Sequence, residues 1–381
     1  MFRLSRLPRQ TSRPEPSRSA LKSFRLADNC GAKSRSGRAF TEVLLIVLVP
    51  CFSLMIWALC DSELKKSLLA GPNKDNLLSV NPVYDAVNME NDTVLTVQGQ
   101  GQLRIWDLKK SVMLGEMQSH LSEVRCADYS PEQRLLAVGS AMGKLEIWDL
   151  EHPEMPVLSD DPTLQEVADC LFTPDGKVLL TSGEDGKLVL WNPRTLERLD
   201  ALVSPDAPES IRSLNISADG NLVIGGTHSG LVQIWDLEQR KLLRTHRVAI
   251  QSRRPEAAVE TVAFVGDGTN FVSATRNDGV AIWNIKTGAC VLRFTGNVLG
   301  LRSGLLSHDG STFTAGSEQG QIVIWDVATG NRIAAPLSRS SIIRSLACSA
   351  DGKTLLSGDW NGRVQFQHES NRAVTAEIAH R

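Results

Sequence analysis

Six tryptophans recur along this chain of 381 residues at nearly regular intervals of 42 to 48 residues. Each closes a short segment that is like Gly-x-x-x-Ile-Trp-Asp, such as GQLRIWDL from Gly101 or GKLVLWNP from Gly186. The six are Trp106, Trp148, Trp191, Trp235, Trp283 and Trp325. A repeat of this length cannot bury its apolar faces without neighbouring copies. A seventh segment, GRVQFQH from Gly362, has Gln367 in place of the tryptophan, so the chain is predicted to close a ring of seven repeats.

Other strands keep the same period, so each repeat contains more than the tryptophan strand. An apolar strand lies upstream of each tryptophan, and pairs such as Asp175-Gly176 and Asn361-Gly362 separate the strands. Glycine in such pairs supplies the positive φ angles of tight hairpins. The predicted inner strands begin at Val83, Val124, Val167, Ile211, Val259, Leu301 and Ile343.

This pattern resembles the WD-repeat β-propeller family over residues 81–381. The resemblance implies an all-β fold, a seven-bladed propeller of four-stranded blades, on a scaffold that carries many unrelated activities. It also implies a hydrogen-bonded network of a His, a Ser or Thr, the strand tryptophan and an Asp in each blade. Here His120 is in place for Trp148, but Val138 occupies the hydroxyl position, and most blades lack the histidine. Cohesion is therefore expected mainly from interdigitated apolar side chains. The seventh blade, without its tryptophan, is expected to open first.

Two segments compete for the outer strand of the seventh blade. AVTAEIAH from Ala373 completes the blade in sequence order, whereas LKKSLLAG from Leu64 completes it by pairing the two ends of the chain. We favour the C-terminal segment, which leaves residues 61–80 as a linker. Gly71-Pro72-Asn73 fits a linker because these residues favour turns.

An uncharged apolar run occupies residues 43–60 and is just long enough to span a bilayer. The tail before it, residues 1–42, has ten Lys or Arg against three acids and is predicted to be disordered. Its net charge of +7 leaves −9 for the rest of a chain that carries −2. This asymmetry predicts a transmembrane signal-anchor at residues 43–60, a cytoplasmic N-terminus and an extracytoplasmic propeller at residues 81–381.

Other interpretations of the apolar run stay open. It resembles a cleaved signal peptide, because Ala58-Leu59-Cys60 offers small residues to a peptidase, or a lipoprotein signal ending at Cys60. The Arg- and Ser-rich tail also fits an organelle transit peptide. A further alternative keeps the propeller in the cytoplasm, with the anchor inserted the other way. The few aromatic residues of the tail do not suggest a nucleic-acid reader, so we expect no specific nucleic-acid partner.

The sequence contains no recognisable catalytic, cofactor or metal motif. The seven histidines form no motif with a Ser, Cys or carboxylate, and no phosphate-binding glycine loop is present. We therefore predict a non-enzyme without a cofactor or metal. The alternative is a propeller enzyme or small-ligand sensor that uses the central channel. For that alternative the inner strands offer only the scattered carboxylates Asp85, Asp128 and Asp169.

The candidate binding residues come from aligning the inner strands at their second residue. In order, these residues are Tyr84, Arg125, Ala168, Arg212, Glu260, Arg302 and Arg344. They should lie at the rim of the channel, on the face where WD-repeat proteins most often take their partners. Four guanidiniums there suit a protein partner with an acidic or phosphorylated segment. In the competing interpretation, each arginine pairs with a neighbouring acid such as Glu123, Glu209 or Glu260. A second basic cluster lies in the longest insertion and comprises Arg244, Arg247, Arg253 and Arg254.

Overall fold

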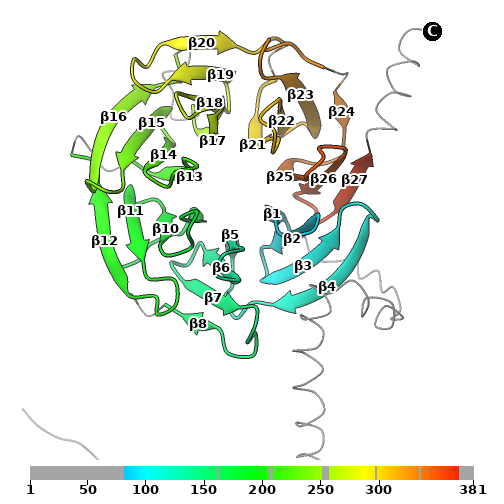
Figure 1. The fold of residues 1–381 in the computed structure, drawn as a ribbon. Coiled ribbons are helices and arrows are strands. Elements are labelled where there is room, and N and C mark those ends of the chain that lie inside the picture. Colours follow the sequence, from blue (N-terminus) through cyan, green and yellow to red (C-terminus); the bar gives the residue numbers. More distant parts are fainter. Residues whose placement is uncertain are drawn as a thin grey trace, which may run out of the picture. The chain divides into compact units, whose positions relative to one another are not determined.

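Seven antiparallel sheets follow one another along the chain and form a ring around a central channel (Figure 1). The computed structural model describes residues 81–159, 161, 163–205, 209–250, 257–296, 298–333 and 336–368. Within these residues six sheets have four strands and the last has three. In each sheet the strands pair in sequence order from the channel outward. This confirms the all-β, seven-bladed propeller expected from the tryptophan period.

The strands occupy the same four positions in successive blades. The innermost strands are β1 (Val83–Asn88), β5 (Val124–Ser130), β9 (Asp169–Phe172), β13 (Ile211–Ile216), β17 (Val259–Val265), β21 (Leu301–Leu306) and β25 (Ile343–Cys348). The second strands are β2 (Thr93–Gln98), β6 (Leu135–Ser140), β10 (Leu179–Ser182), β14 (Leu222–Thr227), β18 (Asn270–Thr275), β22 (Thr312–Ser317) and β26 (Thr354–Asp359).

The tryptophan strands come third and carry six tryptophans over seven blades. They are β3 (Gln102–Asp107), β7 (Leu145–Asp149), β11 (Lys187–Trp191), β15 (Leu231–Asp236), β19 (Gly279–Asn284), β23 (Gln321–Asp326) and β27 (Val364–His368). The outer strands are β4 (Val112–Gln118), β8 (Val157–Leu158), β12 (Arg198–Val203), β16 (Lys241–Arg247), β20 (Cys290–Arg293) and β24 (Leu337–Ser338).

The apolar core lies between neighbouring blades. One cluster joins Leu95 and Leu103 of the first blade to Leu136 and Trp148 of the second. The second strands are buried along their length, as the pattern of β2 and β6 shows, because a blade covers each of their faces. Burying one such leucine is worth about 1.5–3 kcal/mol. Each blade therefore depends on its neighbours for its stability, as the repeat length required.

In three blades a hydroxyl group holds the strand tryptophan, whereas the sequence predicted cohesion mainly from apolar packing. In these blades the indole N–H donates to a Thr or Ser of the second strand at 2.8–2.9 Å. The pairs are Trp106 with Thr96, Trp191 with Thr181, and Trp283 with Ser273. Packing is thus supplemented by a bond within the blade, two residues beyond the direct cross-strand partner of each tryptophan.

The second blade lacks this bond, as Val138 predicted. The indole N–H of Trp148 is buried and has no hydrogen-bond partner among the described residues. His120 stacks on the Trp148 ring, with 5.8 Å between ring centroids. Its Nδ1 lies 2.6 Å from Oε1 of the buried Glu146 and does not bond to the indole. The predicted meeting of His120 and Trp148 therefore occurs, but as a ring contact.

Exchanging Thr and Val at these equivalent positions should shift stability in opposite directions. Thr181→Val leaves the Trp191 N–H buried and unpaired, and we expect a loss of about 1–3 kcal/mol in the free energy of unfolding. Val138→Thr gives the Trp148 N–H an acceptor and is expected to add about 1 kcal/mol. Urea unfolding of both variants tests this. A Val138→Thr variant less stable than the parent chain would show that the hydroxyl does not reach the indole.

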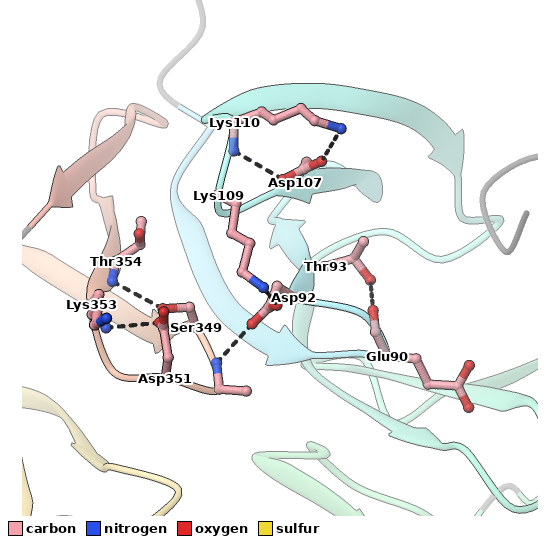
Figure 2. A network of polar contacts seen from close by, with 11 residues as sticks. Glu90, Asp92, Thr93, Asp107, Lys109, Lys110, Ser349, Asp351, Lys353 and Thr354 are labelled. Carbon is pink, nitrogen blue, oxygen red and sulfur yellow. Dashed lines mark hydrogen bonds and ion pairs between the residues drawn. The ribbon is translucent and has the colours of Figure 1, made fainter. Parts of the chain in front are cut away.

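Polar contacts hold the seam between the last and first blades, where β1 packs against β25 and β26. In the β1–β2 turn, Asp92 accepts a bond of 2.9 Å from the backbone N–H of Ala350 and lies 2.5 Å from Nζ of Lys109 (Figure 2). The bond from Lys109, followed by that from Ala350, holds the pKa of Asp92 below its ordinary value. The seam therefore joins residues far apart in the sequence through a charged turn.

His368 bridges the same seam near the outer edge of the blade. Its Nε2 lies 3.1 Å from the Ser111 hydroxyl of the first blade, and its Nδ1 lies 3.1 Å from the hydroxyl of Thr354. Phe366 meets the edge of the Trp106 ring. These contacts replace part of what the missing tryptophan would supply. Early opening of this blade stays a prediction.

Several sequence predictions concern residues outside the described ranges. They are the tail at 1–42, the apolar run at 43–60, the linker at 61–80, and both candidate outer strands, from Leu64 and from Ala373. The closing strand of the seventh blade is therefore still open between the two alternatives.

Candidate partner-binding site at the channel mouth

The second residues of the inner strands do meet at the channel. All seven line one cavity of about 250 Å3, as the sequence alignment predicted. They are Tyr84, Arg125, Ala168, Arg212, Glu260, Arg302 and Arg344.

A β-bulge places six of these side chains. In six blades the pairing of the inner strand with the second strand skips the second residue, as between Val83 and Asp85 or between Ile343 and Ser345. A bulged residue is unpaired and its side chain is re-aimed. The exception is the third blade, where Ala168 precedes β9. The alignment located the residues, but only the paired backbone reveals the bulge.

An ion-pair network occupies the rim at the fifth and sixth blades. Arg276 donates to Glu260 through Nε at 2.9 Å and through a second, closer contact. Arg302 donates to Glu318 at 2.7 Å and lies 3.5 Å from Glu260. The side chain of Glu260 is 8% exposed and that of Arg302 22%, so this network is largely shielded from water. For Arg302, the competing interpretation of ion pairing with Glu260 is correct.

The other three arginines form no ion pair within 4 Å among the described residues. Arg125 and Arg344 lie over the ring of Tyr84, with guanidinium carbons 4.5 and 5.0 Å from its centroid. Arg344 also lies 5.4 Å from the ring of Trp360, which meets Tyr84 edge-on. Trp360 was not among the predicted site residues, because it lies in the β26–β27 turn and outside the tryptophan period.

Arg212 lies near both an acidic group, Glu166, and a histidine, His228, at the rim. Its Nε is buried without a hydrogen-bond partner among the described residues, and the same holds for Nε of Arg125 and Nδ1 of His228. Burial and the neighbouring Glu184 raise the pKa of Glu166, while Arg125 and Arg212 oppose this rise. Burial and Arg212 lower the pKa of His228. The predicted acids Glu123 and Glu209 form no ion pair with these arginines; Glu209 accepts a bond from Thr227 instead.

The three inner-strand aspartates tie neighbouring blades together. Asp85 accepts the backbone N–H of Ala127 at 3.0 Å, Asp128 that of Phe172 at 2.7 Å, and Asp169 that of Leu214 at 2.7 Å. The side-chain oxygen of Asn215 accepts the equivalent bond from the backbone N–H of Phe264 at 3.0 Å. Each carboxylate is thus occupied by backbone donors of the next blade. Burial raises the pKa of Asp85 to about 6 and that of Asp128 to about 7.

Replacing Asp128 by Asn is expected to flatten the pH dependence of stability. The folded carboxyl titrates near pH 7 and the unfolded one near 3.8, so the folded state holds a proton that the unfolded chain releases. This contribution to stability is complete below the unfolded pKa and is lost as pH rises through the folded pKa. The slope reaches about 1.4 kcal/mol per pH unit at most. Urea unfolding from about pH 4 to pH 8 measures the difference.

Asn215 offers the matched control, since it stands at the equivalent strand position and makes the same bond between blades. Asn215→Asp should steepen the loss of stability with rising pH. Parallel curves for Asp128→Asn and the parent chain would contradict the assignment of the titration to Asp128.

Comparisons with known proteins agree with the propeller fold. A family model described as "Nucleolar protein 10-like, N-terminal domain" matches residues 85–305, and "WD domain, G-beta repeat" matches residues 288–326 and 335–366. The chain belongs to the nucleolar protein 10-like family of WD-repeat β-propellers. The resemblance to WD-repeat proteins predicted from the sequence is thereby confirmed.

Curated relatives have low sequence identity to this chain. They are also much longer than the region that aligns with it. A "Periodic tryptophan protein 2 homolog" of Caenorhabditis elegans is 26% identical over 204 residues, 52% of this chain and 21% of the relative. A "WD repeat-containing protein WDS homolog" of Arabidopsis thaliana is 26% identical over 243 residues, 61% and 43%. "Telomerase protein component 1" of Rattus norvegicus is 25% identical over 185 residues, 48% and 7%. The chain therefore spans less than half the length of these relatives.

The predicted localisation is wrong. A single-pass membrane protein with an extracytoplasmic propeller does not fit a WD-repeat family named for a nucleolar protein. No helix within the described part of the chain is long and apolar enough to cross a membrane. The prediction depended on the length of the apolar run and on its flanking charges. These are necessary features of a membrane anchor, but other segments share them.

Proposed function

We propose that this WD-repeat propeller is a non-catalytic platform that binds a protein partner at the mouth of its channel. The observation that carries the proposal is the set of three guanidiniums, of Arg125, Arg212 and Arg344, that face one cavity without an ion pair among the described residues. A relative whose name marks it as a protein component of telomerase supports a role within an assembly.

The chemistry of the rim favours a partner with an acidic or phosphorylated segment. Buried N–H donors without acceptors are costly, and two of them belong to Arg125 and Arg212. A carboxylate or phosphate would accept forked hydrogen bonds from these groups. Tyr84 and Glu260 would then act on the arginines, Tyr84 by stacking and Glu260 by holding Arg302.

The ring would act by rigid display. The bulged side chains project from strands whose other faces are packed between blades, so binding does not have to order them. We place this platform in residues 81–381 and treat residues 1–80 as a separate N-terminal region.

Substituting the unpaired arginines should abolish capture of the partner without unfolding the ring. The variant carries Arg125→Ala, Arg212→Ala and Arg344→Ala and keeps Arg302, because that residue belongs to the ion-pair network. Affinity purification with the full chain, followed by quantitative mass spectrometry, compares it with the parent. The amount of a specific partner recovered with the variant should be at least tenfold lower than with the parent chain.

The control is Arg244→Ala with Arg247→Ala, two residues of the second basic cluster. The structure places them on the exposed outer strand β16 and not in the insertion between blades, while Arg253 and Arg254 lie outside the described residues. This control variant removes positive charge away from the channel and should retain the partner. Circular dichroism melts establish that both variants are folded. Equal capture by the folded channel variant and the parent chain would remove the channel mouth from consideration.

A further inference from the structure

The turns around the channel mouth divide it into two unlike halves. Each turn between a second and third strand ends on a glycine, and the two residues before it differ between blades. They are uncharged in blades 7, 1 and 2, where they read Trp360-Asn361, Gly99-Gln100 and Ala141-Met142. In blades 3, 5 and 6 they include Glu184, Asp278 and Glu318, whereas blade 4 between them has His228-Ser229. The inner strands of the uncharged half, β25, β1 and β5, are neighbours in the ring (Figure 1).

The half of the mouth with uncharged turns nevertheless contains two cationic side chains, which come from its inner strands. Arg125 and Arg344 lie over the same Tyr84 ring, within 5.0 Å of its centroid. The ring supports their planes, and the N–H edges that form forked hydrogen bonds are not used in any ion pair among the described residues. Burial, together with the charge of Arg302, lowers the pKa of Arg344. Tyr84 and Glu260 oppose this shift, so the main cost to the charged guanidinium is its burial, which a bound anion would offset.

An exposed apolar ring flanks one of the two cations. Trp360 is 38% exposed although its ring lies 5.4 Å from the Arg344 guanidinium carbon. In the other half of the mouth the arginine Arg302 is already neutralised by Glu260 and Glu318. The site therefore combines two guanidiniums that form no ion pair within 4 Å among the described residues with an exposed apolar ring at Trp360. Glu166, which lines the same cavity, interacts electrostatically with Arg125 but does not pair with it.

We propose that the sector of blades 7, 1 and 2 binds one oxyanion-bearing side chain of a partner peptide between Arg125 and Arg344, with an apolar neighbour of that side chain on Trp360. The proposal rests on the proposed function and narrows it to two arginines and one motif. A cavity of about 250 Å3 accommodates a side chain and not a folded segment, so the rest of the peptide lies across the mouth. Carboxylate and phosphate share the forked acceptor geometry that the two guanidiniums require.

The test uses the full chain and arrays of immobilised eleven-residue peptides. The central residue is Glu, phosphoserine, Gln or Ser, and the residue beside it is Leu or Gly. We expect at least fivefold more binding to Glu or phosphoserine peptides than to their Gln or Ser counterparts. Leu should increase binding at least threefold over Gly. Preference for Glu identifies a carboxylate as the ligand, and preference for phosphoserine identifies a phosphate.

Variants separate the two parts of the site. Arg125→Gln with Arg344→Gln should abolish the preference for the acidic peptides, while Trp360→Ala should abolish only the preference for Leu. Arg244→Gln with Arg247→Gln on β16 should retain both preferences. If the double channel variant does not fold, Arg125→Lys and Arg344→Lys keep the charge without the fork, and each should lower the acidic preference at least threefold.

Two results would overturn the proposal: no acidic preference in the parent chain, or the same preference in the folded double variant. Failure here is distinguishable from failure of the platform itself. A partner that is captured by the parent chain and lost from the triple alanine variant, without any acidic preference on the arrays, would leave the platform standing and reject this site.

Discussion

Alanine in place of Gly143 is expected to destabilise the propeller by about 2–4 kcal/mol. Gly143 adopts a φ of +69° in the β6–β7 turn, a conformation that strains any residue with a Cβ. A Cβ here would lie 2.5 Å from the carbonyl oxygen of Gln165 and closer still to that of Leu164. Both carbonyls belong to the backbone that enters the third blade, so they cannot move aside as a flexible side chain would. Urea unfolding of the full chain measures the loss.

Gly310→Ala is the matched control for this prediction. Gly310 has a φ of +70°, but no atom lies within 4 Å of the position of its added Cβ. It should therefore suffer only the conformational strain, about 1–2 kcal/mol. Equal losses in the two variants would mean that the contact between blades 2 and 3 at Gly143 yields easily.

Glu146→Ala should cost about 3 kcal/mol, because it removes a buried carboxylate that accepts bonds from the buried Ser119 hydroxyl and from the backbone N–H of His120. The Glu146 side chain is completely buried. It accepts bonds from the hydroxyl of Ser119 at 2.5 Å and from the backbone N–H of His120 at 3.2 Å, and it contacts Nδ1 of His120 at 2.6 Å. These residues link the end of the first blade to the tryptophan strand of the second. Chemical denaturation measures the change in the free energy of unfolding.

Glu116→Ala provides the comparison for the same residue type with an exposed partner. Glu116 pairs with Arg104 at 2.8 Å, but its side chain is 42% exposed. Such a surface pair contributes about 0–1 kcal/mol. If Glu146→Ala were as mild as Glu116→Ala, the buried carboxylate would not be a significant tie between the blades.

Much of the fold could be predicted because the repeat is written in local chemistry. The tryptophan period, the alternating apolar strands and the turn glycines each recur once per blade, so agreement between them identified the blades. The hydroxyls that hold Trp106, Trp191 and Trp283 were not predicted, because the expected hydrogen-bonded network includes a histidine that most blades lack. The extracytoplasmic localisation was wrong because local apolar length and charge do not distinguish an anchor from other segments.

The candidate site could likewise be predicted only in part from the sequence. Aligning the inner strands identified the seven residues that line the cavity, because equivalent positions of a repeat lie at the same height in a ring. It did not show which arginines are neutralised. Glu318 and Arg276, which hold Arg302 and Glu260, come from turns of blades 6 and 5, and Trp360 comes from the corresponding turn of blade 7, outside the tryptophan period.

The sequence by itself determined the number of blades, their strand order and the residues that face the channel, since these follow from periodic patterns within one repeat. Only the tertiary structure decided the β-bulges that aim those residues, the pairing of Arg302 and the unneutralised pair over Tyr84. The reason is physical. Ion pairs and ring contacts depend on distances of a few ångströms between side chains of different blades, and no pattern within a single repeat records those distances.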